Sequence, residues 1–444
     1  MSASTLRQRV PVTVVNDKAA SSASSDSGDE LLTYGEFPAF TPPQFTVKDL
    51  LGAIPQHCFE RSWWRSSLYV VADFAMLAVW GYLASHIDTS FGTHGSLLNG
   101  TPGLVAKWAA WSAYWLMAGF NFTGIWICAH ECGHQAFSTS KTFNNTMGLI
   151  LHSFVLVPYH SWRISHAKHH AATGHMTRDE VFVPHTKTER LKGKEGTGRK
   201  KLIDGQLLDE LLEDAPIYRL YYAVVQQLFG WPAYLFTNAS GQSWYPKGTN
   251  HFDPNSPIFD KRHRNQILIS DAGLLAMIGG LAAFGHYCGG WPAFFKYYFV
   301  PYLMVNHWLV FITYLQHTDP MLPHYRAGMW NFQRGALCTI DRNLLGPVGP
   351  YLMHGICETH VCHHICSKIP HYHAWEATEA LKKVLGEHYV STDENMFKSF
   401  WKSFKYCRFV DDEGDVVFYK DAYGRTSRRV EYEAQPSDSG VDVN

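Results

Sequence analysis

The stretch LVAKWAAWSAYWLMAGFNFTGIWICAHECGH, residues 104–134, carries two signals in one segment. Residues 104–129 are apolar and long enough to cross a bilayer as a helix. Directly after them, His130 and His134 are four residues apart, so that both imidazoles lie on one helix face within reach of one metal ion. The segment therefore predicts a membrane span that ends in metal ligands.

Two further motifs repeat the pattern HxxHH, namely HAKHH at 166–170 and HVCHH at 360–364. Positions i, i+3 and i+4 of a helix converge, so each motif can offer three imidazoles to one centre. Together with the first motif they give eight ligands, too many for one tetrahedral zinc but suited to two metals of higher coordination number. A ninth histidine ends another apolar stretch. The candidate ligands are His130, His134, His166, His169, His170, His317, His360, His363 and His364.

The first motif alone is also the HExxH pattern of zinc metallopeptidases, with Glu131 as general base. An intramembrane zinc protease is thus an alternative, but it leaves both HxxHH motifs unexplained. A non-catalytic metal-transport protein would be expected to place its ligands at bilayer depth. Hydrolytic zinc needs three protein ligands and a water, whereas iron with imidazole ligands can activate O2. The pattern therefore favours a redox metal over zinc.

Four apolar stretches have spanning length, at about 66–87, 104–129, 267–288 and 293–315. A further stretch, 217–237, contains Arg219 and two glutamines. If all histidine motifs build one site, an even number of crossings must separate them, so 217–237 is assigned to the membrane interface. The stretch 148–159 is too short to span.

The predicted fold is an all-α integral membrane protein with four transmembrane helices in two hairpins. A helical cap, residues 130–266 and 316–405, carries the histidines. Lysine and arginine are dense in 163–201 and absent from 88–103, so the positive-inside rule places the cap and both termini in the cytosol. The sequon at Asn99 would be lumenal, but Pro102 follows it and a chance match is favoured.

Composition agrees with such a hybrid protein, because 15% of the 444 residues are aromatic and 17% are charged. The net charge of −1 offers no broad basic field for nucleic acid. Residues 1–45 are expected to form a disordered arm, 46–405 the membrane domain and 406–444 a C-terminal tail. The nine cysteines show no paired spacing and are expected to be mostly free thiols; Cys362 and Cys366 are read as buried rather than ligating.

Carboxylates near the motifs could orient the imidazoles through their second ring nitrogen. These are Glu131, Asp179, Glu180 and Glu358. The remaining histidines considered are expected to be structural, namely His152, His160, His175, His354, His371 and His373.

The motifs and their surroundings resemble the microsomal fatty acid desaturases, specifically the oleate delta-12 group of fungi and plants. The resemblance covers roughly residues 45–405. It is carried by AHECGHQAFS (129–138), GLILHSFVLVPYHSWRISHAKHHAATGHMTRDEVFVP (148–184), GWPAYLFTNASG (230–241), NHFDPNSPIF (250–259), TYLQHTDPMLPHY (313–325) and THVCHHICSKIPHYHAWEAT (359–378).

This resemblance implies that the eight motif histidines and His317 bind two irons in an endoplasmic reticulum membrane enzyme. The enzyme would insert a cis double bond into oleoyl chains to give linoleoyl chains. It would use O2 and two electrons from cytochrome b5, supplied by an NADH-dependent reductase. No flavin, NAD or haem is expected in this chain, because the dinucleotide fingerprint and the His-Pro-Gly-Gly signature are absent.

Several alternatives stay open within the family. An omega-3 or bifunctional desaturase and a fatty acyl hydroxylase would use the same oxidant, the acyl carrier is phospholipid or coenzyme A, and a homo-oligomer is compatible with the sequence. Two departures from relatives are visible. Gln135 stands where many plant members have histidine, and Thr313 stands where related acyl-CoA desaturases have asparagine, with Asn306 a candidate substitute.

Overall fold

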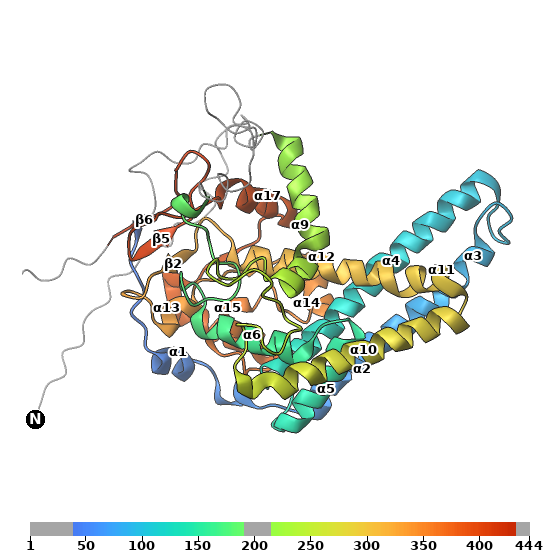
Figure 1. The fold of residues 1–444 in the computed structure, drawn as a ribbon, viewed down its shortest axis with the longest axis horizontal. Helices are drawn as coiled ribbons and strands as arrows, with labels where there is room; N and C mark the ends of the chain where they lie inside the picture. The colour runs from blue at the N-terminus through green and yellow to red at the C-terminus, as the bar shows by residue number, and fades with distance from the viewer. Residues whose placement is uncertain (1–38, 191–214, 432–444) are drawn as a thin grey trace, which may run out of the picture.

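The computed structural model describes residues 39–190 and 215–431, and most of this chain is helical (Figure 1). The longer helices are α2 (Trp63–Ser85), α4 (Gly100–Gly133), α5 (Lys141–Phe154), α6 (Tyr159–Ala172), α9 (Pro216–Thr237), α10 (Arg264–Tyr287), α12 (Val300–His317), α16 (His371–Leu385) and α17 (Met396–Tyr406). The shorter ones are α1 (Val47–Ala53), η2 (Gln56–Phe59), α3 (Ile87–Ser90), η4 (Lys261–His263), α11 (Gly290–Phe294), η5 (Phe295–Phe299), α13 (Phe332–Ala336), η6 (Gly346–Val348), α14 (Gly349–Leu352), α15 (His360–Ile365) and η7 (Gly386–His388).

Among the described residues, three helical segments are long and apolar enough to cross a membrane, namely Trp63–Ser90, Lys261–Tyr287 and Gly290–His317. They coincide with three of the four predicted spans. The fourth, 104–129, lies inside the 34-residue α4. This helix is not among the three, because its tryptophan, tyrosine and asparagine side chains lower its mean hydropathy. In Figure 1, α2, α4, α10 and α11 extend together away from the cap.

Ion pairs and hydrogen bonds join the helix pair α2 and α4 to the helix pair α10 and α12 at the ends far from the cap. Asp88, in α3, accepts hydrogen bonds from Lys296 at 2.5 Å and from the Trp111 indole at 3.0 Å. Lys107 lies 2.9 Å from the same carboxylate. The turn between α2 and α4 therefore lies beside the turn between α10 and α12.

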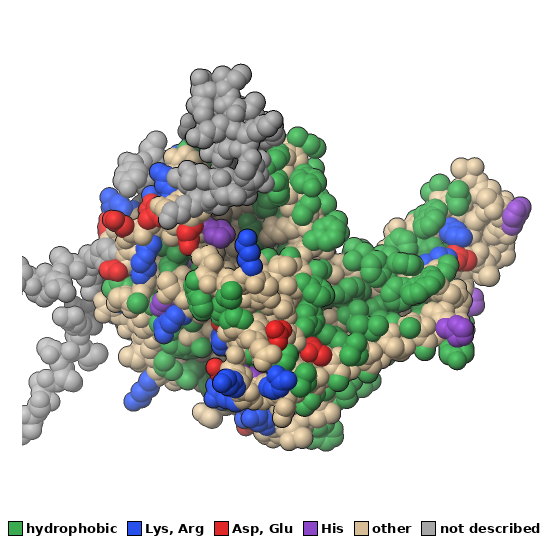
Figure 2. Space-filling model, viewed as in Figure 1, with side chains coloured by type: hydrophobic (Ala, Val, Ile, Leu, Met, Phe, Trp, Pro, Cys, Tyr) green, Lys and Arg blue, Asp and Glu red, His purple; other side chains and the backbone are tan. Residues whose placement is uncertain are grey.

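Helix α9 packs against α12 on one side and leaves a long apolar face uncovered (Figure 2). The exposed side chains include Ile217, Tyr221, Phe229 and Phe236. An apolar face of this length suits a helix that lies against lipid. The stretch 148–159, predicted to be too short to span, forms the end of α5 and the start of α6, which pack against α10.

Three small sheets, which the sequence analysis did not predict, add short strands to this mostly helical fold. They are formed by β1 (Ala39–Phe40) with β6 (Arg429–Val430), β2 (Pro323–Tyr325) with β5 (Val416–Phe418), and β3 (Asp341–Arg342) with β4 (Ser391–Thr392). Strands of two or three residues are too short to give a periodic pattern. The described parts of the arm and tail thus pack on the cap, while residues 1–38 and 432–444 of these segments lie outside the described chain.

The contact between α4 and α12 depends on a glycine. A Cβ added at Gly119 would lie 2.4 Å from the Cβ of Met304. A Cβ added at Gly279 in α10 would meet nothing within 4 Å. We expect Gly119→Ala to lower the apparent melting temperature in detergent, since overpacking costs about 1–3 kcal/mol. Gly279→Ala should leave it unchanged or raise it, because alanine favours the helix. Equal melting temperatures for the two variants would refute this packing.

Candidate metal centre

Four helix ends bring all nine predicted ligands together. His130 lies in the last turn of α4, and His134 is the C-terminal cap of this helix. The second motif lies in the last turns of α6, His317 is the last residue of α12, and α15 begins at His360. Because the helices converge at these ends, imidazoles far apart in the sequence meet in the cap.

The first cluster contains five histidines whose ligand atoms all lie within 4.8 Å of one another, namely His130, His134, His166, His170 and His363. The Nε2 atom of His166 lies 3.2 Å from Nε2 of His130 and 3.2 Å from Nε2 of His170. Three nitrogens from two helices therefore point at one place, as ligands of one ion do.

The second cluster adjoins the first. The ligand atoms of His169, His317 and His364 lie within 4.8 Å of one another. His360 extends this group, since its Nε2 is 3.2 Å from Nε2 of His317. The His364 ring stacks on His170 of the first cluster at 4.2 Å between centroids. The nine imidazoles thus divide into two neighbouring groups of five and four, which suits two metal ions.

The protonation state of the clustered histidines and the lack of hydrogen-bond partners for several of their nitrogens are both consistent with metal binding. Burial lowers the pKa of His166, His170, His363 and His364 well below the usual value, and the neighbouring imidazoles lower it further. The rings are therefore neutral, which is the form that ligates metals. Among the described residues, the buried Nε2 atoms of His134, His363 and His364 have no hydrogen-bond partner. A cation would satisfy these nitrogens.

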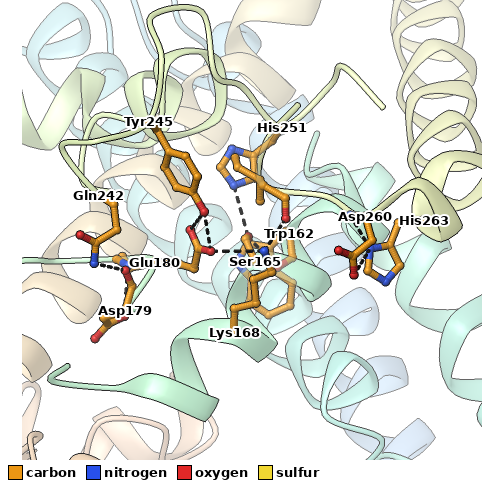
Figure 3. A network of polar contacts seen from close by, with 12 residues as sticks. Trp162, Ser165, Lys168, Asp179, Glu180, Gln242, Tyr245, His251, Asp260 and His263 are labelled. Carbon is orange, nitrogen blue, oxygen red and sulfur yellow. Dashed lines mark hydrogen bonds and ion pairs between the residues drawn. The ribbon is translucent and has the colours of Figure 1, made fainter. Parts of the chain in front are cut away.

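Asp179 is the best-placed orienting carboxylate. Its Oδ1 lies 2.6 Å from Nδ1 of His169, which leaves Nε2 of that ring for the second cluster. The carboxylate also accepts backbone N–H groups of Gly174 at 2.8 Å and Val181 at 3.2 Å. Gln242 donates to the Asp179 carbonyl at 2.7 Å (Figure 3). This support fixes the carboxylate behind the histidine.

The other predicted carboxylates differ in their contacts. Glu131 lies 3.6 Å from Nδ1 of His130 and accepts the backbone N–H of His371 at 3.0 Å. Glu180 instead accepts from the Tyr245 hydroxyl at 2.8 Å and lies 3.4 Å from Lys168 (Figure 3). Burial raises the pKa of Glu358 to about 7, and its Oε2 has no hydrogen-bond partner in the described chain.

The two departures from relatives have structural explanations. Gln135 adopts the left-handed conformation, with φ 63°, after the end of α4. Its Nε2 donates to the Cys132 carbonyl at 3.0 Å, so the side chain closes the helix. The Thr313 hydroxyl donates to the Leu309 carbonyl at 2.6 Å. Asn306 is buried in α12 with Oδ1 unpaired within the described residues.

The six histidines expected to be structural stay out of both clusters. His354 pairs with Asp73 at 2.8 Å, and His371 lies 3.8 Å from Glu131. All nine cysteines are free, and Cys362 is fully buried outside both histidine groups. Two neighbours of the clusters could not be predicted from any motif: the Thr173 hydroxyl lies 3.2 Å from Nδ1 of His364, and Trp162 stacks on His166.

An apolar cavity of about 270 Å³ leads to the histidines. Most of its walls come from α4, α6, α9 and α12. The apolar lining includes Trp126, Ile127, Trp231, Leu309, Val310 and Ile312. The histidines that line it come from both clusters, namely His130, His166, His169, His317 and His360. A long apolar substrate in this cavity would therefore reach both metal positions.

Fold and site together define a helical membrane protein whose histidine clusters can hold metal ions beside an apolar cavity. The family model described as fatty acid desaturase matches residues 106–395, and one described as a domain of unknown function matches residues 4–84. The chain belongs to the fatty acid desaturase family.

Three relatives show the breadth of the similarity. A Delta(12) fatty acid desaturase of Mortierella alpina is 51% identical, covering 85% of this chain and 91% of the relative. The Delta(12)-fatty-acid desaturase of Arabidopsis thaliana is 42% identical, covering 88% and 94%. An oleate hydroxylase of Claviceps purpurea is 40% identical, covering 93% and 89%.

The contact between Asp179 and His169 predicts a loss of metal affinity in Asp179→Asn. Removing such a supporting carboxylate lowers metal affinity about 10- to 100-fold. Iron retained by the purified protein should be measured against rising chelator concentration. Glu180→Gln is the matched control, because its carboxylate contacts Tyr245 and Lys168, and it should keep its iron. Iron retention by Asp179→Asn equal to that of the control would contradict this role.

Proposed function

We propose that the chain is a delta-12 fatty acid desaturase that converts oleoyl into linoleoyl chains. Two adjacent methylenes lose two hydrogens, O2 takes these together with two electrons and two protons, and the products are a cis double bond and two waters. The observation that carries this proposal is the apolar cavity that ends on imidazoles of both clusters. The two Delta(12) desaturase relatives support the position of the double bond.

We assign the two irons to the nine clustered histidines. When bound, the irons supply the O2-dependent oxidising power that an unactivated methylene requires. The chain's own residues position the substrate and exclude water. Trp126, Trp231 and Val310 surround the cavity next to the clusters. A saturated acyl chain offers no polar group for recognition, so its position depends on the shape of this apolar wall.

The membrane arrangement proposed is four spans in two hairpins, with α4 as the fourth span. The joined turns at Asp88 and Lys296 support it, because both hairpins then turn on the same side. The cap bears basic residues where α10 begins, at Lys261, Arg262 and Arg264 (Figure 2). We place this face on the cytosolic side of the endoplasmic reticulum membrane. Cytochrome b5 and its reductase would deliver electrons there.

Hydroxylation of oleoyl chains is the second candidate. The Claviceps purpurea relative named oleate hydroxylase aligns with 93% of this chain. The same cavity and clusters would serve both reactions, and they differ in whether oxygen is transferred to the substrate. A zinc protease is disfavoured, because five imidazoles in the first cluster exceed the three ligands of catalytic zinc.

Expression in a host that makes oleate but no polyunsaturated fatty acids separates these reactions. Mass spectrometry with assignment of double-bond positions should show linoleate. Added alpha-linolenate would indicate a bifunctional enzyme, and hydroxylated oleate would favour the second candidate. His169→Ala and His363→Ala should abolish the product while membrane insertion is kept. Linoleate formation by either variant would contradict the assigned ligands.

The cavity makes a separate prediction at Gly230. A Cβ there would lie 3.1 Å from a methyl group of Val310, and Gly230 itself lines the cavity. Gly230→Leu should lower product formation at least about tenfold with full iron content, because the side chain fills the substrate space. Gly81→Leu is the control, since a Cβ at that position of α2 meets nothing within 4 Å. Normal product from Gly230→Leu would show that the acyl chain binds elsewhere.

A further inference from the structure

A second group of ligand-type side chains lies outside the nine histidines. His57 and Cys58 are adjacent in η2, and His373 and Glu376 are three residues apart on α16. One ligand atom from each of the four residues lies within 4.8 Å of those of the other three. Two segments more than three hundred residues apart thus supply a sulfur, two imidazoles and a carboxylate to one place.

The sulfur–nitrogen distance in this group matches that of a tetrahedral zinc site, and the nitrogen–oxygen distance is that of a hydrogen bond that zinc would replace. Ligands about 2.0–2.3 Å from zinc lie roughly 3.3–3.8 Å from one another. The Cys58 sulfur is 3.8 Å from Nε2 of His57, and this nitrogen is 2.8 Å from Oε2 of Glu376. The ring centroids of His57 and His373 are 5.6 Å apart. Small side-chain rotations would bring all four donors around one ion.

Burial and charge also suit a cation. The Cys58 side chain is fully buried, whereas the side chains of His57 and Glu376 are 51% and 53% exposed. An ion could therefore reach the site from solvent on the side of His57 and Glu376 and bind the buried sulfur on its inner side. One thiolate and one carboxylate balance the charge of a divalent ion, and two neutral imidazoles complete a set that zinc favours.

We propose that His57, Cys58, His373 and Glu376 form a structural zinc site. It fastens the segment before α2 to α16, the helix that follows the third histidine motif. Other contacts join the same elements, since the backbone N–H of Ser62 donates to the Tyr372 hydroxyl at 3.0 Å. Zinc here would stabilise the packing of the N-terminal segment on the cap. This role is independent of the reaction catalysed at the two histidine clusters.

Metal content and cobalt spectroscopy test the site. Full-length protein purified in detergent with iron bound should contain one zinc per chain in addition to iron, and Cys58→Ser should lose that zinc while keeping its iron. Cobalt added to the zinc-stripped protein should give a thiolate-to-cobalt charge-transfer band. The nine clustered ligands are imidazoles, so they cannot produce this band.

Two further variants complete the design. Cys288→Ser removes an exposed thiol in another part of the molecule and should keep both the zinc and the band. His373→Asn should weaken zinc binding at least about tenfold and tests the site if Cys58→Ser does not fold. The proposal is overturned if wild-type protein shows no thiolate band, or if His373→Asn binds zinc as tightly as wild type. Either result would leave an ordinary ion pair of His57 with Glu376.

Discussion

Nine imidazoles pack against one another inside the cap, and seven of these histidines are buried. A buried polar nitrogen without a partner costs about 1–3 kcal/mol, and Nε2 atoms of His134, His363 and His364 are of this kind. A bound cation would be coordinated by these nitrogens, so that they would no longer be unpaired. The helix ends that present the imidazoles must then stay in register, and carboxylates such as Asp179 hold individual rings in place.

The packing of the imidazoles also separates inner from outer helices. In the segment Gly290–His317, which ends in a candidate ligand, 56% of the most apolar 18-residue stretch is buried. The corresponding share is 17% in Trp63–Ser90 and 11% in Lys261–Tyr287. Helix α4 also ends in ligands, and residues 118–132 of it are all buried. Helices that supply ligands thus form the core, while α2 and α10 present apolar side chains outward. The cavity lies between α9 and the two long ligand-bearing helices, α4 and α12.

The clustering of the histidine motifs and three of the four long apolar helices could be predicted because both depend on local properties. Helical spacing sets the convergence of i, i+3 and i+4, and apolar length sets the ability to cross a bilayer. The wall that α9 gives to the cavity depends on tertiary packing, and so does the contact of Glu180 with Tyr245 instead of a histidine. The group containing His57 and His373 was missed because its members belong to distant segments with no shared motif.

We propose that the two histidine groups hold two redox irons in one chain. The most direct test is the metal content of purified wild-type protein, combined with Mössbauer spectroscopy of protein grown on enriched iron. We expect two irons per chain in imidazole-rich, magnetically coupled sites. A single zinc at the first cluster with no iron, or one isolated iron per chain, would contradict it.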